Sequence, residues 1–112
     1  MATDKGGLEK KKKIKYTVIF HPKFKNDLQK AYDYYEEKRV NLGEDFLLSI
    51  EEALAWIEEH PLSFQKIYGN KRKVNTRRFP YGIIYFVKGT IIYVTIAIPL
   101  YRNPAIWKKR SF

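Results

Sequence analysis

The chain of 112 residues lacks cysteine altogether, which excludes a disulfide scaffold, a thiolate zinc site and a cysteine nucleophile. It has only two histidines, His21 and His60, which disfavours a histidine-rich metal site, and we expect neither a metal nor a cofactor. No apolar run approaches the ~20 residues that a membrane-spanning helix needs. The lysine-rich start is not followed by an apolar stretch of signal-peptide length. These absences predict a cytoplasmic protein with no membrane partner.

Acidic residues are missing from the C-terminal half. Residues 63–112 contain eleven Lys and Arg but no Asp, Glu or His, whereas residues 21–62 contain ten acids and five bases. A general gain in solubility would explain the net charge of +10, but not fifty consecutive residues without an acid. The uneven distribution favours two unlike surfaces, one of which faces a polyanion or an acidic partner.

Hydrophobic periodicity divides the first half of the chain. Residues 1–13, with two glycines and a lysine run, predict a disordered basic arm or a remnant of an expression vector. Residues 14–20 alternate like a strand. Apolar side chains at helical spacing then predict one helix after Pro22 and a second one from Glu44 to the His60-Pro61 pair. The short connection between them predicts an antiparallel helical hairpin.

From Ser63 onward, apolar side chains recur at every second residue, which is typical of strands. Turn residues separate expected strands over residues 65–68, 71–79, 83–88 and 90–98, and residues 103–107 predict a short terminal turn of helix. The order β-α-α-β-β-β-β predicts one α+β domain over residues 14–112, with the hairpin packed on one face of a mainly antiparallel sheet. The expected core places five strand residues beneath five helix residues: Ile83, Ile84, Ile92, Val94 and Ile96 beneath Leu28, Phe46, Ile50, Leu54 and Ile57.

The most basic segment is the expected strand over residues 71–79. Alternation would put Lys71, Lys73, Asn75 and Arg77 on one face and Arg78 on the other. If helices cover one face, the opposite face presents a ladder of cations suited to phosphate binding. Alternatively, these charges protect an edge strand against aggregation.

The C-terminal segment mixes aromatic and basic side chains. Tyr101 or Trp107 beside Arg102 could stack on a base of RNA or single-stranded DNA, with Lys108 adding positive charge. Alternatively, Trp107 seals the core.

Two motifs resemble a known superfamily. The run from Arg78 to Val87, RFPYGIIYFV, resembles the central strand motif of the RelE/ParE toxin superfamily, and Arg102 to Trp107 is similar to the R-x-P-x-x-W ending of its ParE-like, plasmid-stabilisation branch. The resemblance implies a RelE/ParE-like fold and a small basic toxin of a type II toxin–antitoxin system, neutralised by an acidic antitoxin. It also implies a target, because RelE-like members cleave mRNA on the ribosome and some ParE-like members inhibit DNA gyrase.

Three functions are open on these residues. The first is a growth-inhibiting toxin that binds a macromolecular target, the second is a ribosome-dependent endoribonuclease, and the third is a non-toxic nucleic-acid-binding module. Cleavage needs a proton donor and acceptor, and the lack of His, Asp and Glu in residues 63–112 favours the first. The candidate catalytic residues, should the chain be an enzyme, are Arg77, Arg78, Tyr101 and Arg102. The candidate target-binding residues are Lys71, Lys73, Arg77, Arg78, Tyr85, Arg102 and Lys108.

Overall fold

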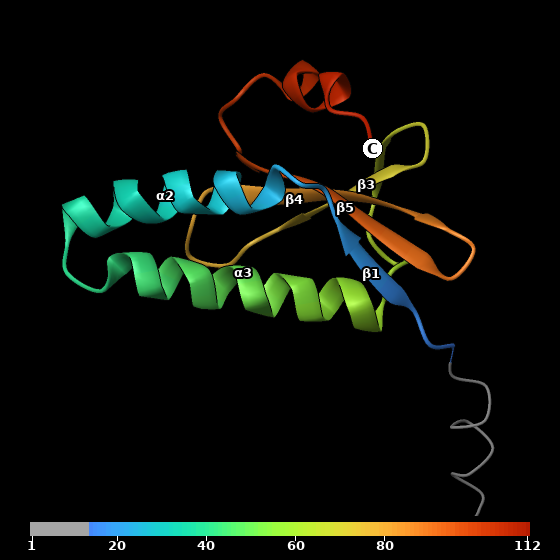
Figure 1. Cartoon of the computed structure of the whole chain (residues 1–112), viewed down its shortest axis with the longest axis horizontal. Helices are drawn as coiled ribbons and strands as arrows, with labels where there is room; N and C mark the ends of the chain where they lie inside the picture. Colours follow the sequence, from blue (N-terminus) through green and yellow to red (C-terminus); the bar gives the residue numbers. More distant parts are fainter. Residues whose placement is uncertain (1–13) are drawn as a thin grey trace, which may run out of the picture.

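The computed structural model describes residues 14–112, so the expected arm over residues 1–13 lies outside the described residues. Its elements follow the predicted order and confirm the α+β class (Figure 1). They are β1 (Thr17–Phe20), α2 (Phe24–Lys38), α3 (Leu42–Glu59), β2 (Lys66–Tyr68), β3 (Lys71–Asn75), β4 (Tyr81–Lys88), β5 (Ile91–Pro99) and the 3₁₀ helix η1 (Pro104–Lys109). Within residues 14–112, no helix is long and apolar enough to span a membrane.

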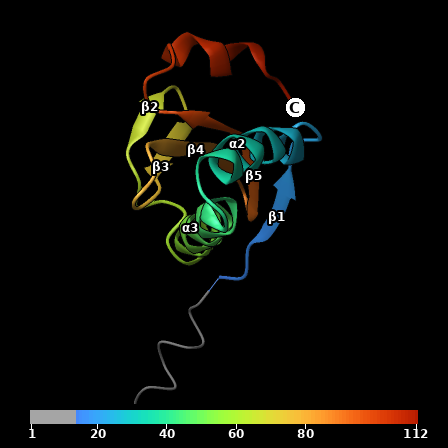
Figure 2. The same ribbon diagram turned by 90° about the vertical axis from the view of Figure 1, so that its left-hand side faces the viewer.

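The five strands form one sheet in the order β1-β5-β4-β3-β2. β1 runs parallel to β5, and the remaining pairs are antiparallel. The parallel pair is possible because the chain between the first strand and the rest contains the helical hairpin, which provides the necessary crossover. Figure 2 shows the C-terminal segment across the sheet from α3. We call the face of the sheet under α2 and α3 the inner face, and the opposite one the outer face.

The turn between α2 and α3 is fixed by one carboxylate. Both Asn41 N and Gly43 N donate to the side chain of Glu36, each at 2.9 Å. Asn41 adopts a left-handed conformation, with φ 70°. A side chain at position 43 would bring its Cβ within 2.8 Å of the Tyr32 ring, so the two helices approach closely only because Gly43 lacks one.

The inner face carries the main core. Phe46, Ile50 and Ile57 of α3 are buried against Ile83 and Tyr85 of β4 and their neighbours on β5. The Tyr85 hydroxyl donates to the carbonyl oxygen of Pro61 at 2.7 Å, which satisfies its polar atom inside the core. Burial raises the pKa of Tyr85 to about 12, with a small opposing effect of Arg72.

A β-bulge divides the core between the two faces. The pairing of β4 with β5 shifts by one residue, from Tyr85 opposite Val94 to Ile84 opposite Ile96, so Thr95 is the extra residue. Ile84, Ile96 and Ile98 therefore form a second cluster on the outer face with Ile106. The prediction that Ile84 and Ile96 lie beneath the helices is wrong. Alternation sends Ile84 away from Ile83, and the bulge reverses the side on which Ile96 lies.

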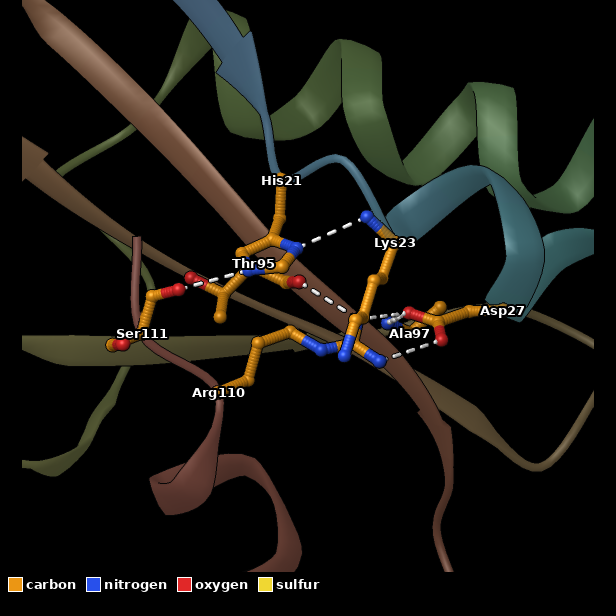
Figure 3. A network of polar contacts seen from close by, with 7 residues as sticks. All are labelled: His21, Lys23, Asp27, Thr95, Ala97, Arg110 and Ser111. Carbon is orange, nitrogen blue, oxygen red and sulfur yellow. Dashed lines mark hydrogen bonds and ion pairs between the residues drawn. The ribbon is translucent and has the colours of Figure 1, made fainter.

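The C-terminal segment is tied to the bulged edge of β5, where β1 has ended (Figure 3). Asp27 accepts a hydrogen bond from Ala97 N at 3.1 Å, and Arg110 donates to the carbonyl oxygen of Thr95 at 3.1 Å. The Arg110 guanidinium also pairs with both carboxylate oxygens of Asp27, at 2.6 and 3.0 Å. Asp27 and Arg110 thus satisfy backbone groups on the edge of β5 beyond the end of β1, and their bidentate pair holds the segment after η1 in position.

His21 adds a second attachment for the segment. Its Nδ1 accepts from Lys23 N at 3.0 Å, so its Nε2 carries the hydrogen that is donated to the carbonyl oxygen of Ser111 at 2.8 Å (Figure 3). The expected terminal turn of helix is present as η1, while the side chain of Trp107 lies outside the described residues.

Candidate target-binding surface

Two of the candidate lysines lie on the outer face. In β3, Val74 is buried in the inner core, so alternation directs Lys71 and Lys73 outward. The ammonium of Lys71 lies 4.4 Å from the centroid of the Phe86 ring, a cation–π contact. Lys73 has no ion-pair partner among the described residues. Both lysines thus present positive charge on the side of the sheet away from the acidic helices.

Lys73 and Arg102 meet at a hollow of about 230 Å³ on this face, which we call the outer hollow. Its other lining residues are Ile67, Gly82, Ile84, Ile98, Pro99 and Leu100. A Cβ on Gly82 would lie 3.2 Å from both Lys73 Cδ and Leu100 Cδ2, so the glycine lets the lysine stem lie against β4. The outer hollow combines an apolar floor with two cations and has no carboxylate or imidazole in its lining.

The segment after β5 presents Tyr101 and Arg102. Leu100 N donates to Pro80 O at 2.8 Å and Arg102 N to Pro99 O at 3.1 Å, which fixes the turn that carries both side chains. Tyr101 is 81% exposed. Arg102 also lines a second depression of about 540 Å³ between α2, the end of β5 and the C-terminal segment, which we call the α2 groove. Arg102 therefore lies between the two depressions.

Arg77 and Arg78 lie elsewhere. The expected strand over residues 71–79 ends at Asn75, and the prediction that Arg77 shares a face with Lys71 and Lys73 is wrong. The Thr76 hydroxyl donates to Phe79 O at 2.9 Å and closes a loop in which Arg78 has φ 70°. The two guanidinium groups pair with carboxylates of α3: Arg77 with Glu52 at 3.4 Å and Arg78 with Asp45 at 3.5 Å.

Tyr85 is removed from the candidate surface. Its side chain is 0% exposed in the inner core, so the prediction that it contacts a target is wrong. The sequence indicated this burial, because Tyr85 lies two residues after Ile83 in the same strand and therefore shares its face of the sheet. Lys108, in η1, places its ammonium 4.3 Å from the centroid of the Tyr68 ring, next to β2.

The α2 groove contains residues that the sequence did not single out as functional. Tyr35 and Tyr81 line it together with Lys30. Burial raises the pKa of Tyr81 to about 12, with smaller contributions from Tyr35, Tyr101 and Asp27 and an opposing one from Arg102. Burial also raises the pKa of Tyr35. Both phenols stay neutral near pH 7 and can donate hydrogen bonds. No local pattern marks this groove, because it forms from segments far apart in the chain.

These arrangements are suited to binding anions beside apolar groups. Proton transfer in strand cleavage would need a base and an acid near the cations, and the outer hollow supplies neither as His, Asp or Glu. Among the described residues, no group of three or more His, Asp or Glu is placed to hold a metal ion.

Comparison with known proteins agrees with this fold. A family model described as "ParE toxin of type II toxin-antitoxin system, parDE" matches residues 18–98. The fold is similar to that of a solved chain described as "Chromosomal ParDE TA system from P. aeruginosa", with a TM-score of 0.66 and 17% sequence identity. That match covers 76% of this chain and 96% of the other. No curated protein matches the chain significantly.

Proposed function

The chain belongs to the ParE toxin family of type II toxin–antitoxin systems, and from this premise we propose that it arrests growth by binding a protein target through its outer face. Membership implies an antitoxin partner. We propose further that this antitoxin is acidic and that the target is DNA gyrase rather than the ribosome or its mRNA. Either target would be met in the cytoplasm.

The observation that carries the proposal is the outer hollow with its two cations. Neither Lys73 nor Arg102 has an ion-pair partner among the described residues, so both charges are available to a carboxylate or a phosphate. The apolar floor of Ile84, Ile98 and Leu100 favours an apolar side chain bound between the two cations. A protein surface offers such a side chain and an RNA backbone does not. The lack of a nearby base and acid favours binding over cleavage.

The test compares single variants of the full chain under inducible expression. Lys73→Ala and Arg102→Ala should relieve growth arrest, because each removes a charge from the outer hollow. Arg77→Ala is the matched control, since it removes one positive charge from the loop between β3 and β4, where Arg77 pairs with Glu52 of α3, and it should leave arrest intact. Arrest that survives Lys73→Ala and Arg102→Ala but disappears in Arg77→Ala would contradict the proposal.

Two assays then identify the target. Purified wild-type protein should inhibit gyrase supercoiling, and the loss caused by Lys73→Ala should shrink as salt is added, because exposed charge pairs are screened. Primer extension on cellular mRNA should show no new ends. Discrete mRNA ends that vanish in Tyr101→Phe would overturn the proposal and make the chain a nuclease, since the phenol would then transfer the proton.

A further inference from the structure

The eleven basic residues of the C-terminal half differ in use between arginine and lysine. Four of the five arginines are held by groups of the chain itself, Arg72 by carbonyl oxygens and the other three by carboxylates: Arg72, Arg77, Arg78 and Arg110. The fifth, Arg102, lines the outer hollow. The remaining positive charge of residues 63–112 is carried by six lysines: Lys66, Lys71, Lys73, Lys88, Lys108 and Lys109.

Three of these lysines lie in a row beside the outer hollow, and we call Lys71, Lys88 and Lys108 the lysine row. The Lys71 ammonium lies 4.4 Å from the centroid of the Phe86 ring, and Lys88 follows Phe86 by two residues on the same face of β4. Two residues of a strand span ~7 Å. Lys108 lies over Tyr68, which is the partner of Lys71 in the pairing of β2 with β3. The row therefore runs from the end of β4 across β3 to η1.

The aromatic ring beneath the row has its contacts filled. Phe86 is stacked on Tyr93 with 4.9 Å between the ring centroids. The Phe112 ring packs edge-on against both, at 5.8 Å from Phe86 and 5.0 Å from Tyr93. Single-stranded nucleic acids bind largely by stacking their bases on open aromatic rings, and Phe86 is enclosed by these neighbours and by Lys71. The row therefore favours a ligand that is recognised by its charge.

The surroundings of the row favour phosphates in series. Residues 63–112 contain no Asp or Glu, and the helices α2 and α3 with their acids cover the opposite face of the sheet. Neither Lys71 nor Lys88 has an ion-pair partner among the described residues. Lysine is a point charge and lacks the planar fork with which arginine reads guanine. A row of lysines therefore suits a phosphate backbone without preference for base sequence.

We propose that the lysine row binds the phosphodiester backbone of double-stranded DNA, independently of its sequence. This inference goes beyond the proposed function, because none of the three lysines lines the outer hollow and their ligand is not the protein target. B-DNA offers a phosphate every ~3.4 Å along each strand, so each ammonium group can reach a different one. Because the row and the outer hollow lie on one face, a protein target that is itself on DNA can engage both at once.

The probe is a short fluorescein-labelled DNA duplex. Its binding to the full-length toxin, made by cell-free synthesis, is followed by fluorescence anisotropy over a range of salt concentrations. Lys71→Gln, Lys88→Gln and Lys108→Gln are made singly and together, and circular dichroism verifies that the variants are folded. A control triple variant removes the same charge at exposed positions outside the row: Lys25→Gln, Lys38→Gln and Lys66→Gln.

We expect each single substitution in the row to flatten the slope of log affinity against log salt by about 0.9, because one phosphate contact and its released counterion are lost. The triple variant of the row should bind the duplex about tenfold more weakly at low salt, and the control triple variant less than about threefold more weakly. Duplexes of unlike base sequence should lose affinity equally, since backbone contacts carry no sequence information.

Equal losses in the two triple variants would overturn the inference, because binding would then follow net charge and not the row. The absence of duplex binding by the wild type at low salt would overturn it as well. A loss confined to Lys73→Gln and Arg102→Gln would assign the DNA to the outer hollow instead. Tighter binding of a single-stranded RNA of the same length would show that the duplex is the wrong ligand.

The inference and the proposed function fail separately. If DNA binding depends on the row while the wild-type chain does not arrest growth, the proposed function is wrong and the assignment of the row stands. If growth arrest depends on Lys73 and Arg102 while DNA binding is absent or indifferent to the row, only the assignment of the row is wrong.

Discussion

The two faces of the same sheet differ in how their polar groups are used. On the inner face, the Tyr85 hydroxyl is bound to Pro61 and that of Ser49 to the carbonyl oxygen of Arg77, so these groups serve the fold. On the outer face, Lys73 and Arg102 line an apolar hollow with no partner for their charges among the described residues.

This difference separates, residue by residue within single strands, the side chains that serve the fold from those that the proposed function assigns to target binding. Val74 is buried in the inner core, whereas its neighbour Lys73 reaches the outer hollow. The division predicts that inner-face substitutions act on unfolding, that outer-face substitutions act on growth arrest, and that few positions affect both.

The largest expected effect is on the inner face. Ile50 is 2% exposed, so Ile50→Asp would bury an unpaired charge and should prevent folding. Leu48→Asp is the control on the same helix, because Leu48 is 62% exposed. Circular dichroism and thermal melting should show an unfolded Ile50→Asp chain and a nearly unchanged Leu48→Asp domain. A soluble Ile50→Asp protein that melts cooperatively would show that the comparison of faces is wrong.

The next largest effect concerns the edge of the sheet, where Asp27 serves the backbone and Arg110 together. Asp27→Ala leaves Ala97 N without its acceptor and leaves the Arg110 guanidinium, which is only 17% exposed, with the carbonyl oxygen of Thr95 but no carboxylate. This should cost about 2–4 kcal/mol. Asp33→Ala, at an exposed position of α2, should cost less than about 0.5 kcal/mol. Chemical denaturation measures both. Equal losses of unfolding free energy in the two variants would mean that the Asp27 carboxylate does not stabilise this edge of the sheet.

Much of the fold could be predicted because its signals are local. Helical spacing in α2 and α3 and alternation in β3 depend on neighbours a few residues away, and the element order followed from them. The bulge at Thr95 could not be predicted, since it arises from the register of β5 against Ile84 of β4. The expectation for Ile96 failed for that reason.

The candidate surface was predicted in part for a similar reason. The outward direction of Lys71 and Lys73 follows from alternation. Arg77 and Arg78 instead lie in a loop, and they pair with carboxylates of α3 that are far away in sequence. The α2 groove combines Lys30, Tyr81 and Arg102, and only the folded chain brings these together.

Alkaline pH offers a smaller effect on the inner face. The unfolded chain ionises tyrosine near pH 10, whereas burial raises the pKa of Tyr85 to about 12 in the folded state. The folded state therefore holds this proton more tightly, and the stability it contributes is complete below pH 10 and is lost as pH rises to 12. Between pH 10 and pH 12, the free energy of unfolding measured by chemical denaturation should fall by on the order of 2 kcal/mol more in the wild type than in Tyr85→Phe. If the free energy of unfolding falls equally with pH in the two proteins, the Tyr85 hydroxyl does not contribute the predicted stability.

The smallest expected effect on stability sharpens the comparison most. The double substitution Lys71→Gln/Lys73→Gln keeps a polar side chain with two methylene groups at each position, while it removes the ammonium over Phe86 and a second positive charge beside Gly82. Because both groups lie on the outer face and satisfy no buried acceptor, the free energy of unfolding should change by less than about 0.5 kcal/mol. Relief of mutual repulsion would offset the lost cation–π contact. Growth arrest, by contrast, should be strongly weakened.

Chemical denaturation and inducible expression measure the two quantities on one protein. A loss of stability as large as that of Asp27→Ala, with arrest unchanged, would mean that the outer lysines serve the fold and that the two faces do not divide these roles.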